Sequence, residues 1–287
     1  MKTFNNKVAV ITGAASGIGL GLARHAAKLG MKLVIVDIEE LPLTNAQREL
    51  EALGVEVLAM KTDVSDAEQM DQLANETIKR FGTVHLLFNN AGVGGGGAIW
   101  ELDTDYWEWV LGVNLWGVIH GIRTFTKHMV AQKEGHIINT ASIAGLMSAP
   151  STGPYTVSKH AVVGLSETLF GDLRNAEANV GVSVLCPAFV DTKIYAAERN
   201  RPMDDALKND PARIAEQQAI ETMAADFFST TLSPEAVAEQ VFKAIVEGDF
   251  YILTHPKGSK VQIEKRMHSI LQNGHPTATG PEDFPLE

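Results

Sequence analysis

The chain has 287 residues, of which 45% are apolar and 21% charged, and its formal net charge is −11. This composition is that of an ordinary globular protein and excludes an intrinsically disordered chain. Cys186 is the single cysteine, which excludes a disulfide scaffold and a four-cysteine zinc site. The acidic balance argues against nucleic acid or an anionic membrane as a partner, because both require clustered Lys and Arg.

Several other classes of protein are also disfavoured. No apolar run approaches the ~20 residues that span a bilayer, and the run at residues 8–11 is too short for the core of a signal peptide. His120, His128 and His136 lie outside any His-Glu-x-x-His pattern, so we expect no metal site. The absence of a Gly-x-Ser-x-Gly motif disfavours a serine hydrolase. We therefore expect a cytoplasmic globular protein.

Along the chain, short β-branched runs alternate with amphipathic segments. Continuous apolar runs are typical of strands covered on both faces, and their alternation with helices predicts a doubly wound parallel sheet of the α/β class. Ligands bind at the carboxyl ends of the strands in such sheets. The predicted strands are residues 7–12, 31–37, 55–60, 84–88, 135–140, 180–185 and 251–254, and the predicted helices are residues 17–29, 43–53, 67–81 and about 155–177.

Two segments depart from this alternation. Residues 191–232 are rich in charge and contain Pro202 and Pro211, so they predict a mobile substrate lid with a short helix at residues 211–228. Residues 255–287 form a C-terminal extension, whose last part, from residue 272, is rich in Gly and Pro and should be an irregular arm or a frayed tail. We expect one domain over residues 1–287, with the lid and the extension attached to it.

A glycine-rich loop follows the first predicted strand. Gly13, Gly17 and Gly19 let the main chain approach a pyrophosphate, which would lie at the positive N-terminus of the next helix beside Ser16 and Ile18. The same glycines also suit a simple tight turn between strand and helix.

Asp37 ends the second predicted strand, 18 residues after Gly19. An acid about 20 residues after the glycines receives the 2′-hydroxyl of a ribose in dinucleotide-binding proteins. A carboxylate there repels a 2′-phosphate, and Ile38, Glu39 and Glu40 supply no cation, so NAD is favoured over NADP. The alternative is a solvated acid at a strand end.

Other polar residues follow the third and fourth strands. Asp63 and Val64 suit contact with an adenine, although Asp63 would equally cap the following helix. Asn90, Ala91 and Gly92 lie at the end of the fourth strand, where an asparagine either braces a turn or binds a ribose.

Tyr155 and Lys159 are spaced i, i+4 on a predicted helix and therefore share a face. An ammonium group near a phenol favours the phenolate, so the pair would exchange a proton with an alcohol or carbonyl. Ser142 follows a strand at the same edge of the sheet and would hold the substrate oxygen, unless it is only a turn or capping residue.

Together these residues resemble the short-chain dehydrogenase/reductase family, the type with a TGxxxGxG loop and a YxxxK active site. The resemblance extends from about Lys7 to Thr254 and implies a Rossmann-like fold, a nicotinamide cofactor and a homodimer or homotetramer. It implies that Tyr155 is the general acid/base, that Lys159 lowers its pKa and binds the nicotinamide ribose, and that Ser142 orients the carbonyl. Asn114 would hold a relay water, Asn90 would shape the cofactor pocket, and Pro187, Val190 and Thr192 would lie along the nicotinamide.

The chain departs from the family pattern in three places. Ala188 stands where a glycine usually follows Pro187, Ala141 precedes Ser142 where a serine is common, and the chain continues well past Thr254. Ala188 tolerates fewer backbone angles than glycine, so we expect a change in the nicotinamide loop. The extension would complete a neighbour's site or a subunit interface.

The residues after the strands predict a mainly apolar substrate pocket, and hence a neutral hydrophobic or aromatic secondary alcohol or ketone. Aromatic residues around one helix, including Trp109, favour a core or subunit interface over a ligand patch. An NADPH-preferring carbonyl reductase and a non-catalytic dinucleotide-binding regulator are the alternatives. The predicted pocket residues are Val93, Gly94, Ala144, Leu146, Met147, Phe189, Ile194 and Tyr195.

Overall fold

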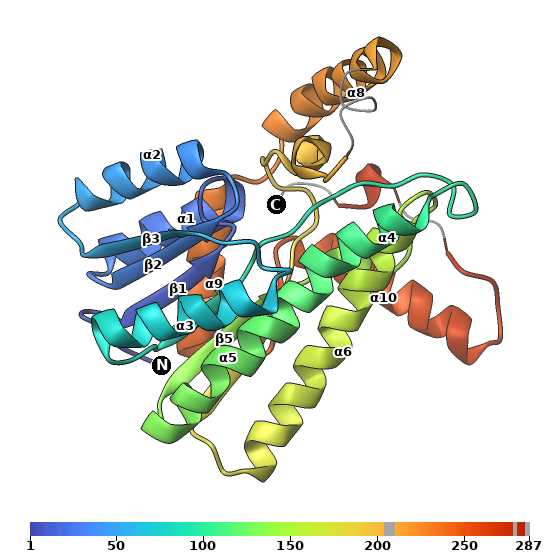
Figure 1. Cartoon of the computed structure of the whole chain (residues 1–287). Helices are drawn as coiled ribbons and strands as arrows, with labels where there is room; N and C mark the ends of the chain where they lie inside the picture. The colour runs from blue at the N-terminus through green and yellow to red at the C-terminus, as the bar shows by residue number, and fades with distance from the viewer. Residues whose placement is uncertain (204–209, 278–279, 285–287) are drawn as a thin grey trace.

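A single parallel sheet organises the chain, as a computed structural model describes it over residues 1–203, 210–277 and 280–284. Its strand order is β3-β2-β1-β4-β5-β6-β7, which confirms the predicted doubly wound parallel sheet (Figure 1). The predicted strand positions agree with the structure to within a few residues. The strands are β1 (Val8–Thr12), β2 (Lys32–Asp37), β3 (Val57–Lys61), β4 (Leu86–Asn89), β5 (Gly135–Thr140), β6 (Val180–Cys186) and β7 (Tyr251–Leu253).

Helices cover both faces of the sheet (Figure 1). On one face α1 (Gly17–Lys28), α2 (Glu40–Glu51) and α9 (Pro234–Glu247) pack on apolar residues of the central strands. On the other face α3 (Ala67–Phe81), α5 (Gly117–Gln132) and α6 (Gly153–Asn175) do the same. Burial on both faces explains why the strand sequences are continuously apolar rather than alternating.

The strand order reverses between β1 and β4. After β1 the chain adds β2 and then β3 on one side of β1. After β4 it adds β5, β6 and β7 on the opposite side of the sheet. The loops that follow β1 and β4 therefore diverge at the carboxyl edge of the sheet, and the space between them is where doubly wound sheets bind ligands.

One helix contains a local change of hydrogen-bonding pattern. Helix α4 (Thr104–Leu111) continues through a π-helical turn, η1 (Gly112–Trp116), directly into α5. Such π-turns occur mostly at functional sites. Here the turn contains Asn114, whose side chain is completely buried.

The lid segment folds over the carboxyl edge of the sheet as a 3-10 helix, η3 (Ile194–Asn200), and helix α8 (Pro211–Ser229). Figure 1 shows α8 projecting beyond the body of the sheet domain. Residues 204–209 of the predicted lid lie outside the described residues.

The C-terminal extension is more ordered than its composition predicts. It begins with helix α10 (Pro256–Leu271), which we did not predict, and ends in a short 3-10 turn, η4 (Pro281–Asp283). The Gln262 side chain donates a hydrogen bond to Asp283 over 2.6 Å, and Phe284 is buried against Phe189 and Met147 of the same chain. Residues 280–284 are therefore docked on the domain rather than frayed.

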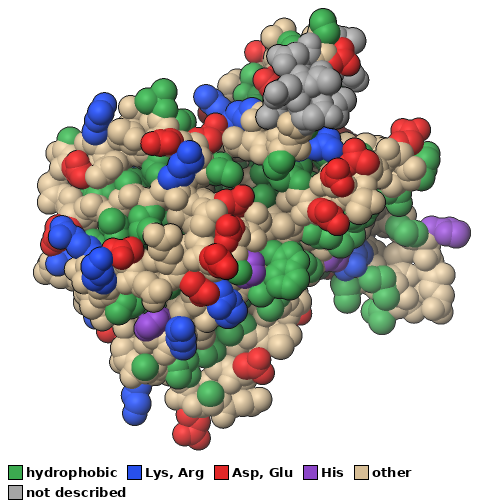
Figure 2. Space-filling view, viewed as in Figure 1, with side chains coloured by type: hydrophobic (Ala, Val, Ile, Leu, Met, Phe, Trp, Pro, Cys, Tyr) green, Lys and Arg blue, Asp and Glu red, His purple; other side chains and the backbone are tan. Residues whose placement is uncertain are grey.

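Two further observations concern the helices and the surface. Within the described residues, no helix is both long and apolar enough to cross a membrane. On the face in Figure 2, acidic and basic side chains are interspersed rather than gathered into one basic patch.

Gly19 is expected to be essential for the packing of α1. A Cβ at Gly19 would lie 2.0 Å from the Gly13 carbonyl oxygen, whereas a Cβ at Gly164 on α6 meets nothing within 4 Å. We expect Gly19→Ala to lower the free energy of unfolding by about 1–3 kcal/mol, the usual cost of overpacking. Gly164→Ala is the matched control and should be neutral or stabilising, because alanine favours helix. Urea unfolding measures both, and equal stability of the two variants would contradict the packing described here.

Candidate active site

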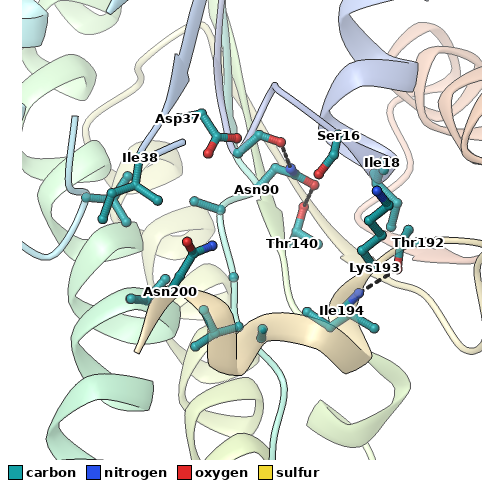
Figure 3. Close-up of a pocket in the computed structure, with 18 of the residues that line it drawn as sticks. Ser16, Ile18, Asp37, Ile38, Asn90, Thr140, Thr192, Lys193, Ile194 and Asn200 are labelled. Carbon is teal, nitrogen blue, oxygen red and sulfur yellow. Dashed lines mark hydrogen bonds between the residues drawn. The ribbon is translucent and has the colours of Figure 1, made fainter. Parts of the chain in front are cut away.

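One cavity of about 540 Å³ lies at the carboxyl edge of the sheet, between the loops after β1 and β4. Residues from both sides face each other across it: Asp37 and Ser16 from the β1–β2 side lie opposite Ile194 and Asn200 of the lid (Figure 3). Every predicted cofactor residue lines the cavity except Gly19, which packs behind the glycine loop. Those residues are Gly13, Ser16, Gly17, Ile18, Asp37, Asp63, Val64, Asn90, Ala91, Gly92, Tyr155, Lys159, Pro187, Val190 and Thr192.

The glycine loop brings backbone to the cavity where side chains would block it. Gly13 and Gly17 have φ angles of 64° and 52°, a region that favours glycine. A Cβ at Gly13 would lie 2.8 Å from Ala91 Cα, and one at Gly17 would lie 2.9 Å from the Thr192 methyl group. The Ser16 side chain makes no capping hydrogen bond to α1. Ser16, Gly17 and Ile18 at the N-terminus of α1 line the cavity. The backbone of this loop and the first turn of α1 therefore fit the pyrophosphate of a dinucleotide.

The Asp37 carboxylate is held in place by backbone groups. Its Oδ2 accepts a hydrogen bond from the Ala15 N–H over 3.0 Å, and its Oδ1 accepts one from the Glu39 N–H over 3.1 Å. Burial raises the pKa of Asp37, and these N–H groups oppose that rise. Each carboxylate oxygen can accept a further hydrogen bond, so the pair suits ribose hydroxyls.

Asp63 does not cap the following helix, contrary to the alternative interpretation of the sequence. The cap of α3 is Asp66, which accepts hydrogen bonds from the Glu68 and Gln69 N–H groups. Asp63 instead accepts hydrogen bonds from the Ser65 N–H and hydroxyl, at 2.9 and 2.7 Å. This turn keeps Asp63 and Val64 at the wall of the cavity.

Asn90 joins the ends of three strands. Its side-chain Nδ2 donates to the Thr12 carbonyl over 3.0 Å, and its Oδ1 accepts from the Thr140 hydroxyl over 3.4 Å. Its own N–H and that of Ala91 donate to Thr12 Oγ1. Asn90 thus braces the turn, and the floor of the cavity is fixed by β1, β4 and β5 together.

Tyr155 and Lys159 line the inner end of the cavity, and Ser142, which does not line it, is hydrogen-bonded to Tyr155. The Lys159 Nζ lies 5.5 Å from the centre of the Tyr155 ring and donates a hydrogen bond to the Thr140 carbonyl over 3.0 Å. Ser142 accepts a hydrogen bond from the Ala144 N–H over 3.1 Å, so it caps the short 3-10 helix η2 (Ile143–Gly145) while it also bonds to Tyr155. Capping and contact with Tyr155 are therefore compatible roles of one side chain.

Burial is the largest influence on the protonation of this group. It raises the pKa of Tyr155, which the hydrogen bond to Ser142 partly opposes. It lowers the pKa of Lys159 to about 8, although the neighbouring Cys186 thiol favours the charged amine. A neighbouring side chain thus opposes the effect of burial on each group, Ser142 for Tyr155 and Cys186 for Lys159.

Asn114 fixes the loop after β4 rather than facing the cavity. Its Oδ1 accepts from the Val93 N–H over 2.8 Å, and its Nδ2 donates to the Val93 carbonyl over 2.9 Å and to the Ser158 hydroxyl over 3.2 Å. A Cβ at Gly92 would lie 3.3 Å from Asn114 Oδ1 and 3.5 Å from Lys159 Nζ. The amide of Asn114 is thus occupied by protein groups beside Lys159.

Of the eight predicted substrate residues, Val93 and Ile194 line the cavity, and the other six do not. Gly94 packs directly on Ile194. Leu146, Met147 and Phe189 form an apolar cluster with Phe284. Tyr195 stacks on Phe228 of α8 at 5.4 Å between ring centres, and Ala144 bonds to Ser142.

The cavity also contains residues that were not predicted, among them Trp109, Arg199, Asn200 and Phe228. Trp109 lines the cavity and also packs against the buried Tyr106 and Val110, as expected of a core residue, whereas Trp100 and Trp116 are exposed. A turn at residues 191–201 and helix α8 bring the other three into the site, and no spacing in the sequence signals that contact.

Ala188 does not distort the nicotinamide loop through a left-handed backbone. Its φ angle is not in the positive range, and its N–H donates to the Thr254 hydroxyl over 3.2 Å. The backbone here needs no glycine.

His136 and His120 are packed inside the fold. His136 is buried and bonds to Ser183 over 2.8 Å, and His120 is buried beside Trp116. Across the described ranges, no group of three or more His, Cys, Asp or Glu side chains is placed to hold a metal ion.

Comparisons with known proteins agree with this geometry. Residues 7–202 match the family model for short chain dehydrogenases. A "CLA biosynthesis dehydrogenase/reductase" of Lactiplantibacillus plantarum is 38% identical over 96% of this chain and 97% of its own length, and a "C alpha-dehydrogenase" of Sphingobium sp. is 34% identical over 98% and 91%. A solved short-chain dehydrogenase/reductase from Burkholderia phymatum in complex with NAD is 48% identical, with a TM-score of 0.89, covering 98% of this chain and 99% of that one.

The lowered pKa of Lys159 predicts a pH-dependent stability. Between pH 8 and its ordinary value of 10.5, the folded state has released a proton that the unfolded state still holds, so stability rises with pH. We expect the unfolding free energy of the wild type minus that of Lys159→Met to rise by about 3 kcal/mol between pH 7 and 10.5. Urea unfolding across this range measures it. A flat difference would mean that Lys159 keeps its proton, contrary to its burial.

Proposed function

Because the chain belongs to the short-chain dehydrogenase/reductase family, whose members are NAD(P)-dependent oxidoreductases acting on alcohols and ketones, we propose that its cofactor is NAD. The substrate is a neutral, hydrophobic or aromatic secondary alcohol or ketone. The observation that carries the proposal is that Tyr155 and Lys159 line the same cavity as Asp37, with Ser142 hydrogen-bonded to Tyr155.

Each of the three inner residues has a separate role in the proposed reaction. Tyr155 donates a proton to the carbonyl oxygen, or accepts one from the alcohol, in concert with the hydride step. The bonded Ser142 hydroxyl holds the same oxygen. Lys159 favours the phenolate of Tyr155 and, 5.5 Å from its ring, lies where it would also bind the nicotinamide ribose. The nicotinamide, when bound, supplies or accepts the hydride.

Preference for NAD over NADP is supported by the charge at the end of β2. Asp37 and Glu39 both line the cavity there. Two carboxylates at this point repel the 2′-phosphate of NADP and leave the 2′-hydroxyl of NAD as the better ligand of Asp37. The guanidinium of Arg199 is nearby, but Glu39 already binds it.

An apolar substrate is supported by the walls of the inner cavity. Val93, Trp109, Ala188, Ile194 and Phe228 line the cavity. Ligand sites of this kind hold the apolar body of a small molecule while a few polar groups orient it. The lid contributes Ile194 and Phe228, so it would cover the substrate and exclude water.

The direct test is turnover with a panel of ketones and secondary alcohols, each with NAD(H) and with NADP(H). We expect turnover with the NAD pair, favouring aromatic substrates, and a loss of about 10²–10⁴-fold in Tyr155→Phe with NADH binding retained. Tyr251→Phe, on the far edge strand β7, is the matched control. Turnover retained in Tyr155→Phe would refute the role of Tyr155, and equal use of NADP(H) would refute the preference for NAD.

Phe228 should determine preference among substrates. Its ring lines the cavity, whereas the neighbouring Phe227 packs on Phe189 and Phe228 without lining it. Loss of an aromatic contact is worth about 0.5–1.5 kcal/mol, so Phe228→Ala should raise KM for an aromatic ketone roughly 3–10-fold relative to a small aliphatic ketone. Phe227→Ala should change this ratio less. The same ratio in both variants and the wild type would place the substrate elsewhere.

A further inference from the structure

An ion pair connects the lid to the end of β2. The Arg199 Nε lies 3.0 Å from Glu39 Oε1, and its Nη2 lies 2.8 Å from Glu39 Oε2. These residues are 160 positions apart in the sequence, so only the fold of the lid brings them together. Both side chains line the cavity.

The remaining nitrogen of the guanidinium is also occupied. Arg199 Nη1 donates to the Ala196 carbonyl over 2.7 Å and to the Lys193 carbonyl over 3.3 Å. The group is therefore fixed at the end of η3, and its position does not depend on Glu39 alone. A substitution that removes only the charge of Glu39 should leave Arg199 where it is.

The pair lies beside the residue that would receive the adenosine ribose. Asp37 accepts the hydrogen bond of the Glu39 N–H and contributes to the raised pKa of Arg199, so the carboxylate and the guanidinium are close enough to interact. Arginine is the side chain that binds phosphate in a two-pronged geometry. A bound 2′-phosphate would thus be repelled by the Glu39 carboxylate, and it would meet an arginine, Arg199, that is already bound to Glu39.

We propose that Glu39 sets cofactor preference by masking Arg199, so that the chain contains a phosphate-binding arginine that is unavailable to NADP. This rests on the proposed preference for NAD. Neutralising Glu39 removes a repulsive charge and also leaves Arg199 without its carboxylate partner, whereas neutralising a carboxylate that does not bind Arg199 removes a charge only. The predicted consequence is a change in the choice between the two cofactors rather than in binding of dinucleotides generally.

Glu39→Gln, Arg199→Gln and the double variant test the masking. Binding of NADH and of NADPH is measured by titration with their fluorescence as the signal. The readout is the ratio of Kd for NADPH to Kd for NADH. A general opening of the lid would change both Kd values by the same factor and leave this ratio unchanged. We expect Glu39→Gln to lower this ratio at least tenfold, and the double variant to lose most of that gain. Glu40→Gln is the matched control, because Glu40 pairs with Lys61 and lies outside the cavity lining.

Three results would overturn the inference. The first is that Glu39→Gln leaves the ratio of the two Kd values unchanged. The second is that the double variant lowers the ratio as much as Glu39→Gln does. The third is that Glu40→Gln lowers it by the same factor. In the last two cases net charge alone explains selectivity. If the wild type binds NADH weakly or prefers NADPH, the proposed function fails instead, and the two failures are distinguished by the wild-type titration itself.

Discussion

The connection between the ends of β1 and β4 determines the rest of the site. Thr12 Oγ1 accepts the N–H groups of Asn90 and Ala91, and Asn90 returns a hydrogen bond to the Thr12 carbonyl. These bonds hold together two strands from which the chain leads away in opposite directions. The glycine loop follows one strand and the Asn90 turn follows the other, so the cavity exists because this pair of strand ends is held at a fixed separation.

Two titratable side chains, Tyr155 and Lys159, lie at the inner end of the cavity, where burial disfavours their charged forms. Lys159 is 3% exposed, and burial disfavours both its ammonium form and the phenolate of Tyr155. Fixed partners offset part of this cost: the Thr140 carbonyl binds Lys159, and Ser142 binds Tyr155. The π-helical turn adds a third support, because it buries Asn114 against the backbone of Val93. Titratable groups poised in this way are typical of proton-transfer sites.

The sequence predicts what local chemistry determines. Apolar runs predicted the strands, glycine spacing predicted the loop, and the distance from Gly19 identified Asp37 at the end of β2. The contacts of Arg199 and Phe228 with the cavity, and of Phe284 with Phe189, could not be predicted, because they depend on the tertiary fold of the lid and the C-terminal extension. Helix α10 lacked a strong periodic apolar face, and the cap of α3 was ambiguous because two aspartates, Asp63 and Asp66, stand three residues apart.

The central claim is that one cavity positions a nicotinamide beside Tyr155 while Asp37 holds the other end of the cofactor. A crystal structure of the protein with NADH tests it most directly. The account predicts ribose hydroxyls on Asp37, the pyrophosphate at the turn of Ser16 and Gly17, and the nicotinamide ring between Val190 and Tyr155. A nicotinamide bound away from Tyr155, or a cavity that stays empty at saturating NADH, would contradict it.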